Sequence, residues 1–261
     1  MSSSPLRITR LARRALSGLL LLLAAGVHAE PLQIGAEDDW YPFTAFRDGA
    51  VRGMSAEIVL AAFAAVDTPV ELVPYPYSRC MQLALQGKLA GCFNTAPDAR
   101  IAEAYQLPRH PLFRDDILLW SRVDRATPVV DLQGLEGARV AVTIGYEYGA
   151  RFDALRTLER VPVRKDLNGF LMLQHGRVDY VVAYRATTAE LLREHPELAG
   201  SFQAVGTVHQ PELYLSFSRS ASRAGWLLQR FDKGMQRIQE DGRYQAILDR
   251  WQYGEAIYPA D

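Results

Sequence analysis

The chain has 261 residues, of which 49% are hydrophobic and 23% charged, with a formal net charge of −1 at pH 7. This composition can supply a folded core, and no low-complexity tract or long charge run indicates disorder. Without residues 1–29, which carry four arginines and no acidic residue, the charge is −5, and this argues against nucleic acid or an anionic membrane surface as a partner.

Residues 1–29 are typical of a secretory signal peptide. Four arginines between positions 7 and 14 precede an apolar core at 19–25, and Val27-His28-Ala29 forms a small-x-small cleavage site. The apolar run is shorter than the ~20 residues of an ordinary membrane span, and an uncleaved anchor is the alternative. We expect cleavage after Ala29, which leaves 232 residues and takes the net charge from −1 to −5 as four arginines are lost.

The first part of the mature chain alternates strands and helices. Residues 32–36 are predicted to form a strand, and residues 55–65 a helix with Ser55 as its N-cap. The unit at 70–100 then contains a strand at 70–73, a helix with Ser78 as N-cap that stops at Gly87, and a strand at 91–93. Residues 116–121 are predicted to return as a strand.

The polar stretch 122–128 is interpreted as the crossing into a second lobe. The strands expected beyond it lie at 139–143, 162–164, 180–183, 202–208 and 214–217, and the helices at 148–156, 168–174, 187–195, 223–239 and 244–251. Alternating strands and helices in two linked units predict two α/β lobes with a cleft between them. We assign residues 30–121 plus 213–261 to lobe 1 and residues 122–212 to lobe 2.

Both cysteines fall within the central unit. Cys80 is expected in the first turn of its helix, facing the sheet, and Cys92 in the strand that follows. Because that helix runs antiparallel to the strand, its start lies near the strand's exit, and a disulfide is plausible in an oxidising compartment. The alternative is two buried thiols that pack as small hydrophobic side chains.

The residues that could carry out catalysis are few. The mature chain has four histidines, at positions 110, 175, 195 and 209, which are scattered without metal-ligand spacing. There is no G-x-S-x-G elbow, no phosphate-binding glycine loop and no C-x-x-C. We therefore expect no metal, no cofactor and no enzymatic activity.

Aromatic and polar side chains, by contrast, gather where predicted strands end. In a parallel sheet these ends meet at one edge, where ligands bind. There an aromatic ring can stack on a ligand while its polar tip bonds to it, although any one ring could instead line the core or the interface between the lobes. The residues at these positions are Trp40, Tyr41, Tyr75, Tyr77, Arg79, Asn94, Thr95, Tyr146, Tyr148 and Tyr184.

Several motifs, in order along the chain, resemble those of the family 3 extracellular solute-binding proteins. They are Trp40-Tyr41-Pro42-Phe43, Gly53-Met54-Ser55, the unit at 70–100, Asp131-Leu132-Gln133-Gly134, and the tail at 238–251. The resemblance covers nearly all of the mature chain. It implies a type II periplasmic-binding-protein fold, a monomer in the periplasm, a small polar ligand such as an amino acid or related carboxylate, and an ABC-transporter permease as partner.

The resemblance also implies roles for first-lobe residues. Glu37 matches an acid that holds a ligand amine, and Trp40 and Tyr77 match aromatics that sandwich the ligand side chain. Thr95 and Arg100 match the residues that hold a carboxylate. Arg100 comes a residue or two early against the family spacing, so Arg79, in the first turn of the central helix, could take that role.

In the second lobe the resemblance is less complete. The family places a glycine and a Ser or Thr after the first strand, where this chain has Gly145 and Tyr146. Tyr184 stands where family members use an aspartate for the amine, so an ordinary α-amino acid is a less secure ligand.

Two other functions remain open from the sequence. Cyclohexadienyl dehydratase resembles the same fold, and Glu37 could serve as a general acid in a closed cleft. A sensory subunit that reports a solute to a membrane kinase or cyclase would show the same motifs.

Overall fold

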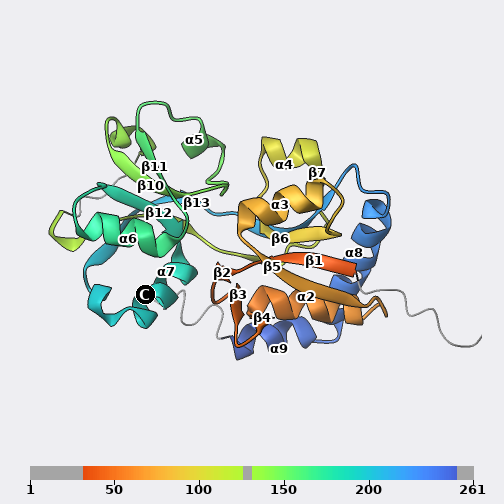
Figure 1. Ribbon diagram of the computed structural model, residues 1–261. Helices are drawn as coiled ribbons and strands as arrows, with labels where there is room; N and C mark the ends of the chain where they lie inside the picture. Colours follow the sequence, from red (N-terminus) through yellow and green to blue (C-terminus); the bar gives the residue numbers. More distant parts are fainter. Residues whose placement is uncertain (1–31, 126–130, 252–261) are drawn as a thin grey trace, which may run out of the picture. The chain divides into compact units, whose positions relative to one another are not determined.

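A computed structural model describes residues 32–125 and 131–251 (Figure 1). The expected signal peptide and its cleavage site lie outside the described residues, as does the end of the predicted crossing at 122–128. Within the described ranges, no helix is both long enough and apolar enough to cross a membrane. The structure confirms the two-lobed α/β fold, and we call the first sheet with its helices the first lobe and the second sheet with its helices the second lobe.

The first sheet brings together strands from both ends of the chain. Its order is β5 (Val70–Tyr75), β1 (Leu32–Glu37), β6 (Gly91–Thr95), β14 (Glu212–Ser218) and β7 (Tyr105–Gln106), and β8 (Phe113–Arg114) also pairs with β14. Strand β1 is parallel to β5 and β6, and β14 is antiparallel to β6. The carboxyl ends of β1, β5 and β6 therefore meet at one edge, as the sequence predicted.

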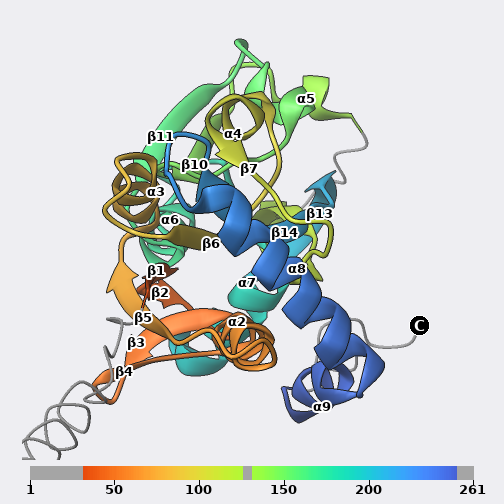
Figure 2. The same ribbon diagram turned by 90° about the vertical axis from the view of Figure 1, so that its right-hand side faces the viewer.

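Helices cover both faces of this sheet (Figures 1 and 2). They are α2 (Met54–Ala64), α3 (Tyr77–Leu85), α4 (Ala99–Ala104), α8 (Ala224–Glu240) and α9 (Arg243–Arg250). Ile34 and Ala36 of β1 belong to the core cluster that contains α2 and α8, while Gly35 between them faces α3. This alternation is the period of two expected for a strand buried on both faces.

The predicted disulfide is present between Cys80 of α3 and Cys92 of β6, whose Cα atoms are 5.9 Å apart. A Cβ built on Gly35 would lie 2.4 Å from the sulfur of Cys80. Glycine at this position therefore lets α3 and its disulfide lie directly on the sheet.

The second sheet has the order β11 (Glu159–Val163), β10 (Arg139–Thr143), β12 (Tyr180–Tyr184), β9 (Ile117–Arg122) and β13 (Phe202–His209). Strands β10, β11 and β12 are parallel, whereas β9 is antiparallel to both of its neighbours. The α-helices after these strands are α5 (Ala150–Asp153), α6 (Asp166–Gln174) and α7 (Arg185–Glu194). Phe170 and Leu173 of α6 pack in the core of this sheet.

Strand β9 was expected in lobe 1, but it pairs with β12 and β13 of the second sheet. The chain passes between the sheets at Asp115-Asp116 and again at Gln210-Pro211. These two passages are in contact, because Gln210 Nε2 donates to Asp116 Oδ1 at 2.8 Å. We propose these two points as the lobe boundaries.

Both predicted N-caps are wrong. Helix α2 begins at Met54 after Gly53, and the hydroxyl of Ser55 instead donates 2.8 Å to the carbonyl of Phe43. Helix α3 begins at Tyr77 with Pro76 at its N-cap. In each case the serine lies one position inside the helix, where its hydroxyl does not cap the backbone.

A three-stranded sheet that was not predicted is formed by β2 (Asp39–Trp40), β3 (Thr44–Arg47) and β4 (Ala50–Arg52). Its hairpin turns at Asp48-Gly49, both with positive φ, the geometry that this dipeptide favours. Helix α5 is shorter than the helix predicted at 148–156, because Gly149 precedes it with φ 88° and the chain turns again after Asp153.

Candidate functional site

The lobes meet through the ends of their strands. Glu37 ends β1, Tyr77 begins α3 after β5, and residues 145–147 follow β10 of the second lobe. The hydroxyl of Tyr146 donates to Glu37 Oε1, and the hydroxyl of Tyr77 donates to Glu147 Oε2 at 2.8 Å. Two hydrogen bonds, one buried and one partly buried, therefore join the carboxyl edges of the two sheets.

Four of the predicted aromatic residues form one cluster at this junction. The ring of Tyr146 lies edge-on to Tyr77, with centroids 5.5 Å apart, and to Trp40, at 6.3 Å. Tyr184 lies edge-on to Trp40 at 4.9 Å. Trp40 and Tyr77 come from the first lobe and Tyr146 and Tyr184 from the second, so the cluster spans the cleft.

The carboxyl groups at the junction have perturbed affinities for protons. Burial raises the pKa of Glu37 well above its ordinary value, against the opposing effect of the hydrogen bond from Tyr146. Burial also raises the pKa of Glu147 to about 8, partly offset by the hydrogen bond from Tyr77. Desolvation likewise raises the pKa of Asp166, at the start of α6, to about 6. Such shifts are typical of functional clefts, although buried structural pairs show them too.

One cavity of about 300 Å³ lies between the lobes beside Tyr146. Its charged lining residues are Glu37, Asp38 and Asp39 with Arg79 from the first lobe, and Asp166 with Arg164 and Lys165 from the second. Lys165 forms a 2.7 Å ion pair with Asp39 across the cleft. The Arg79 side chain forms no hydrogen bond or ion pair with any residue that the structure describes, so its guanidinium is available to a ligand.

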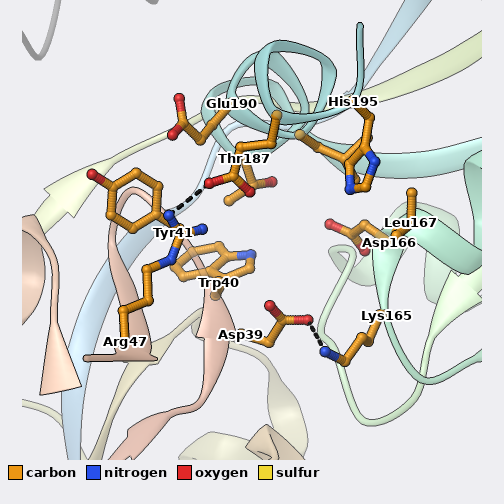
Figure 3. A pocket seen from close by; sticks show the side chains of 12 residues that line it. Asp39, Trp40, Tyr41, Arg47, Lys165, Asp166, Leu167, Thr187, Glu190 and His195 are labelled. Carbon is orange, nitrogen blue, oxygen red and sulfur yellow. Dashed lines mark ion pairs between the residues drawn. The ribbon is translucent and has the colours of Figure 1, made fainter. Parts of the chain in front are cut away.

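A second cavity, of about 240 Å³, shares Asp39, Lys165 and Asp166 with the first (Figure 3). The indole nitrogen of Trp40 points toward this space in Figure 3. That nitrogen is buried and has no hydrogen-bond partner in the described part of the chain. Because a buried N–H without a partner costs about 1–3 kcal/mol, a water or a ligand atom is expected to accept from it.

Thr95 and Arg100, which the family resemblance predicts to hold a ligand carboxylate, do not line the 300 Å³ cavity. The Arg100 side chain is 64% exposed, pairs with Asp98 at 2.8 Å and lies 3.9 Å from Glu147 Oε1. It lines a third cavity, of about 560 Å³, together with Gly145 and Tyr146. The hydroxyl of Thr95 bonds to Ser216 at 3.0 Å inside the first lobe.

The ten predicted site residues therefore divide into groups. Glu37, Tyr77, Arg79 and Tyr146 line the 300 Å³ cavity, Trp40 lines the 240 Å³ cavity, and Arg100 and Gly145 join Tyr146 at the third. Asn94, Thr95 and Tyr184 are buried and line none of these three. Asn94 adopts φ 69°, and both polar atoms of its side chain lack partners among the described residues.

Sequence reasoning missed Glu147, Lys165 and Asp166. Glu147 directly follows two predicted site residues, Gly145 and Tyr146. Lys165 and Asp166 lie where β11 gives way to α6, which is again the carboxyl edge of a parallel strand. A search for charged residues at every strand exit would have found all three.

Across residues 32–125 and 131–251 there is no group of three or more His, Cys, Asp or Glu side chains placed to hold a metal ion. The polar side-chain groups at the cleft are instead carboxyl, hydroxyl, indole and guanidinium groups, which can accept or donate hydrogen bonds. Such a set recognises a small polar molecule by hydrogen bonds and charge.

Solved structures with a similar fold include several binding proteins. A histidine kinase sensor domain with similarity to periplasmic binding proteins matches with a TM-score of 0.76 and 19% identity, covering 86% of this chain and 96% of the other. An ArgBP variant from T. maritima matches at 0.73 and 17%, covering 85% and 94%. The arginine-, lysine-, histidine-binding protein ArtJ from Geobacillus stearothermophilus matches at 0.71 and 15%, covering 86% and 96%. At these identities the likeness shows the fold alone.

No curated protein sequence matches the chain. The family model for the bacterial extracellular solute-binding proteins, family 3, matches residues 32–255. This range contains both sheets, all the described helices and the cleft between the lobes. The chain therefore belongs to the bacterial extracellular solute-binding proteins, family 3.

Proposed function

We propose that the chain is a periplasmic receptor that captures a small polar solute between its lobes and delivers it to the permease of an ABC transporter. The solute is an amino acid or a related carboxylate. Membership of the solute-binding family supports capture of a small molecule, and the amino-acid-binding neighbours support the ligand class.

The observation that carries this proposal is the mixed charge of the 300 Å³ cavity. Glu37, Asp39 and Asp166 can accept from an ammonium group, while Arg79 can donate to a carboxylate. An amino acid presents both of these groups a few ångströms apart. A purely anionic or purely cationic solute would leave one set of charges without a partner, which is costly in a closed cleft.

The proposed role is capture without chemistry. Membership of the solute-binding family supports this role, as does the fold shared with the substrate binding protein of an amino acid ABC transporter. A second candidate role is sensing, and the similarity to a histidine kinase sensor domain favours it. Capture of the solute is common to both roles, and only the partner in the membrane differs.

Native mass spectrometry of protein purified without denaturation, followed by calorimetric titration with each of the twenty amino acids and with short dicarboxylates, tests capture. We expect one or a few zwitterionic compounds to bind with a Kd at or below the micromolar range, equivalent to about −8 kcal/mol. If none of these compounds gives a heat of binding, the proposed ligand class is wrong. Uptake of the labelled ligand by cells with and without the gene then separates transport from sensing.

A further inference from the structure

The first-lobe side chains that were predicted to hold a ligand are already in contact with two residues of the second lobe. The ring of Tyr146 lies edge-on to both Trp40 and Tyr77, the two aromatics expected to sandwich the ligand side chain. The hydroxyl of Tyr146 donates to Glu37, the acid expected to hold a ligand amine. The carboxyl of Glu147 lies 3.9 Å from Arg100, one of the two arginines expected to hold a ligand carboxylate.

These contacts match the three parts of an amino acid in the predicted site. The ring of Tyr146 takes the place of the ligand's side chain, and its hydroxyl takes the place of the ligand's ammonium group as a hydrogen-bond donor. The carboxyl of Glu147 takes the place of the ligand's carboxylate. Both residues are consecutive in the chain, so one short segment provides all three groups.

The backbone around this segment positions it closely against the first lobe. Gly145 has φ 90°, and a Cβ built there would lie 2.9 Å from the Cβ of Ser78. On the other side, the hydroxyl of the buried Tyr148 accepts the backbone N–H of Thr143 at 2.7 Å. Glycine at position 145 therefore allows the segment to approach the first lobe closely, and the bond between Thr143 and Tyr148 closes the turn that carries it.

From this juxtaposition we infer that Tyr146 and Glu147 are resident occupants of the cleft, which close the lobes on each other without ligand and determine specificity because a solute whose carboxylate reaches Arg100 must displace Glu147. The inference rests on the proposed function, since it assumes that the ligand binds between the lobes. A solute that fits beside Tyr146 in the 300 Å³ cavity leaves the pair in place. A solute whose carboxylate approaches Arg100 must move Glu147.

Small-angle scattering of the ligand-free protein tests this, with native mass spectrometry to confirm that no ligand is bound. The doubly substituted variant Tyr146→Ala with Glu147→Ala is expected to have a larger radius of gyration than the wild type, because the lobes separate. The variant Tyr77→Phe with Tyr146→Phe removes only the two bridging hydroxyls and is expected to shift in the same direction. An unchanged radius in a cooperatively folded alanine variant overturns the inference, and if that variant does not fold, the phenylalanine variant decides in the same way.

The matched control is Lys165→Ala, which removes the exposed ion pair to Asp39 across the same cleft. It is expected to leave the radius of gyration unchanged. A shift as large as that of the alanine variant overturns the inference, because loss of any contact between the lobes would then open the cleft. None of these measurements needs a ligand, so the proposed function can fail in the amino-acid panel while the resident pair is still tested. Where an amino acid binds with its carboxylate at Arg100, the alanine variant should bind it at least tenfold more tightly than the wild type.

Discussion

The Tyr77 hydroxyl of the first lobe donates a 2.8 Å hydrogen bond to the Glu147 carboxyl of the second lobe, and both side chains are buried. Two further charged groups, Arg100 and Asp98, lie close enough to affect the pKa of Glu147. The pKa values of the nearby Tyr105 and Tyr184 are raised, first by burial and then by the charge of Glu147. The protonation state of one carboxyl therefore bears on the contact between the lobes.

Glu147→Gln should change how stability depends on pH. Burial raises the pKa of Glu147 to about 8 from an ordinary value of 4.5, so the folded protein binds this proton more tightly than the unfolded chain. Its contribution to stability is fully present below pH 4.5 and is lost as the pH rises to 8. The loss is on the order of a few kcal/mol.

Urea unfolding of the wild type and of Glu147→Gln between pH 5 and 9 measures this contribution. The difference between them should grow in favour of the variant as the pH rises, because glutamine has no proton to lose. Comparing the two proteins cancels the effects of Asp115 and Asp166, whose pKa values burial also raises, to about 7 and about 6. Parallel curves for the two proteins would mean that Glu147 ionises freely in the folded state.

Arg79→Ala and Arg100→Ala should differ in ligand affinity. Arg79 lines the 300 Å³ cavity and has no ion-pair partner among the described residues, whereas Arg100 is paired with Asp98. Loss of a charged hydrogen bond to the ligand costs about 1.5–3 kcal/mol, or roughly a tenfold to hundredfold weaker Kd. Calorimetry with the ligand found in the amino-acid panel should show this loss for Arg79→Ala alone. If Arg100→Ala alone shows this loss, Arg100 binds the ligand carboxylate, as the family resemblance implies.

Intact mass should show that Cys80 and Cys92 are bridged in exported protein. Treatment with a thiol-blocking reagent before reduction should add no mass, and the same treatment after reduction should add two groups. Replacing both cysteines by alanine should lower the free energy of unfolding by about 3 kcal/mol, because the bridge joins residues 12 apart in the sequence and so restricts the unfolded chain. Two blocking groups taken up before reduction contradict the prediction.

Gly234→Ala should destabilise the first lobe, and Gly225→Ala in the same helix should not. A Cβ at Gly234 would lie 2.0 Å from the carbonyl oxygen of Ala62 in α2, whereas a Cβ at Gly225 meets nothing within 4 Å. The crowded site should cost about 1–3 kcal/mol, while alanine at the open site gains up to about 1 kcal/mol of helix propensity. Thermal unfolding of both variants checks this, and equal melting temperatures would show that α8 can shift away from α2.

The sequence predicted the strands and helices of both lobes well where their apolar pattern is long. Residues 32–36, 91–93 and 180–183 lie within β1, β6 and β12, and the helices expected at 223–239 and 244–251 match α8 and α9 within a residue. The short strands β2, β3 and β4 have too few residues to show a period of two. The pairing of β9 with the second sheet depends on which strands lie beside it, and a strand's own sequence does not specify its neighbours.

The sequence predicted that the candidate site lies at the carboxyl edge of the parallel strands, but it did not predict which residues contact each other there. The rule that ligands bind at carboxyl ends of parallel strands located Glu37, Tyr77 and Tyr146. It could not show that Tyr146 bonds to Glu37, because the pairing depends on how the two lobes approach each other. Arg100 illustrates the limit of a family match, since it comes a residue or two early against the family spacing and its guanidinium lies beside Asp98, 64% exposed.

The position of β14 means that the first sheet is complete only when residues 212–218 have joined it. This strand comes from residues 212–218, yet it lies between β6 and β7 and is also the partner of β8. The second sheet, from residues 117–209, is contiguous and can form first. A chain truncated before residue 212 therefore retains every strand of the second sheet and leaves an unpaired edge on β6. Such an edge invites pairing with other chains.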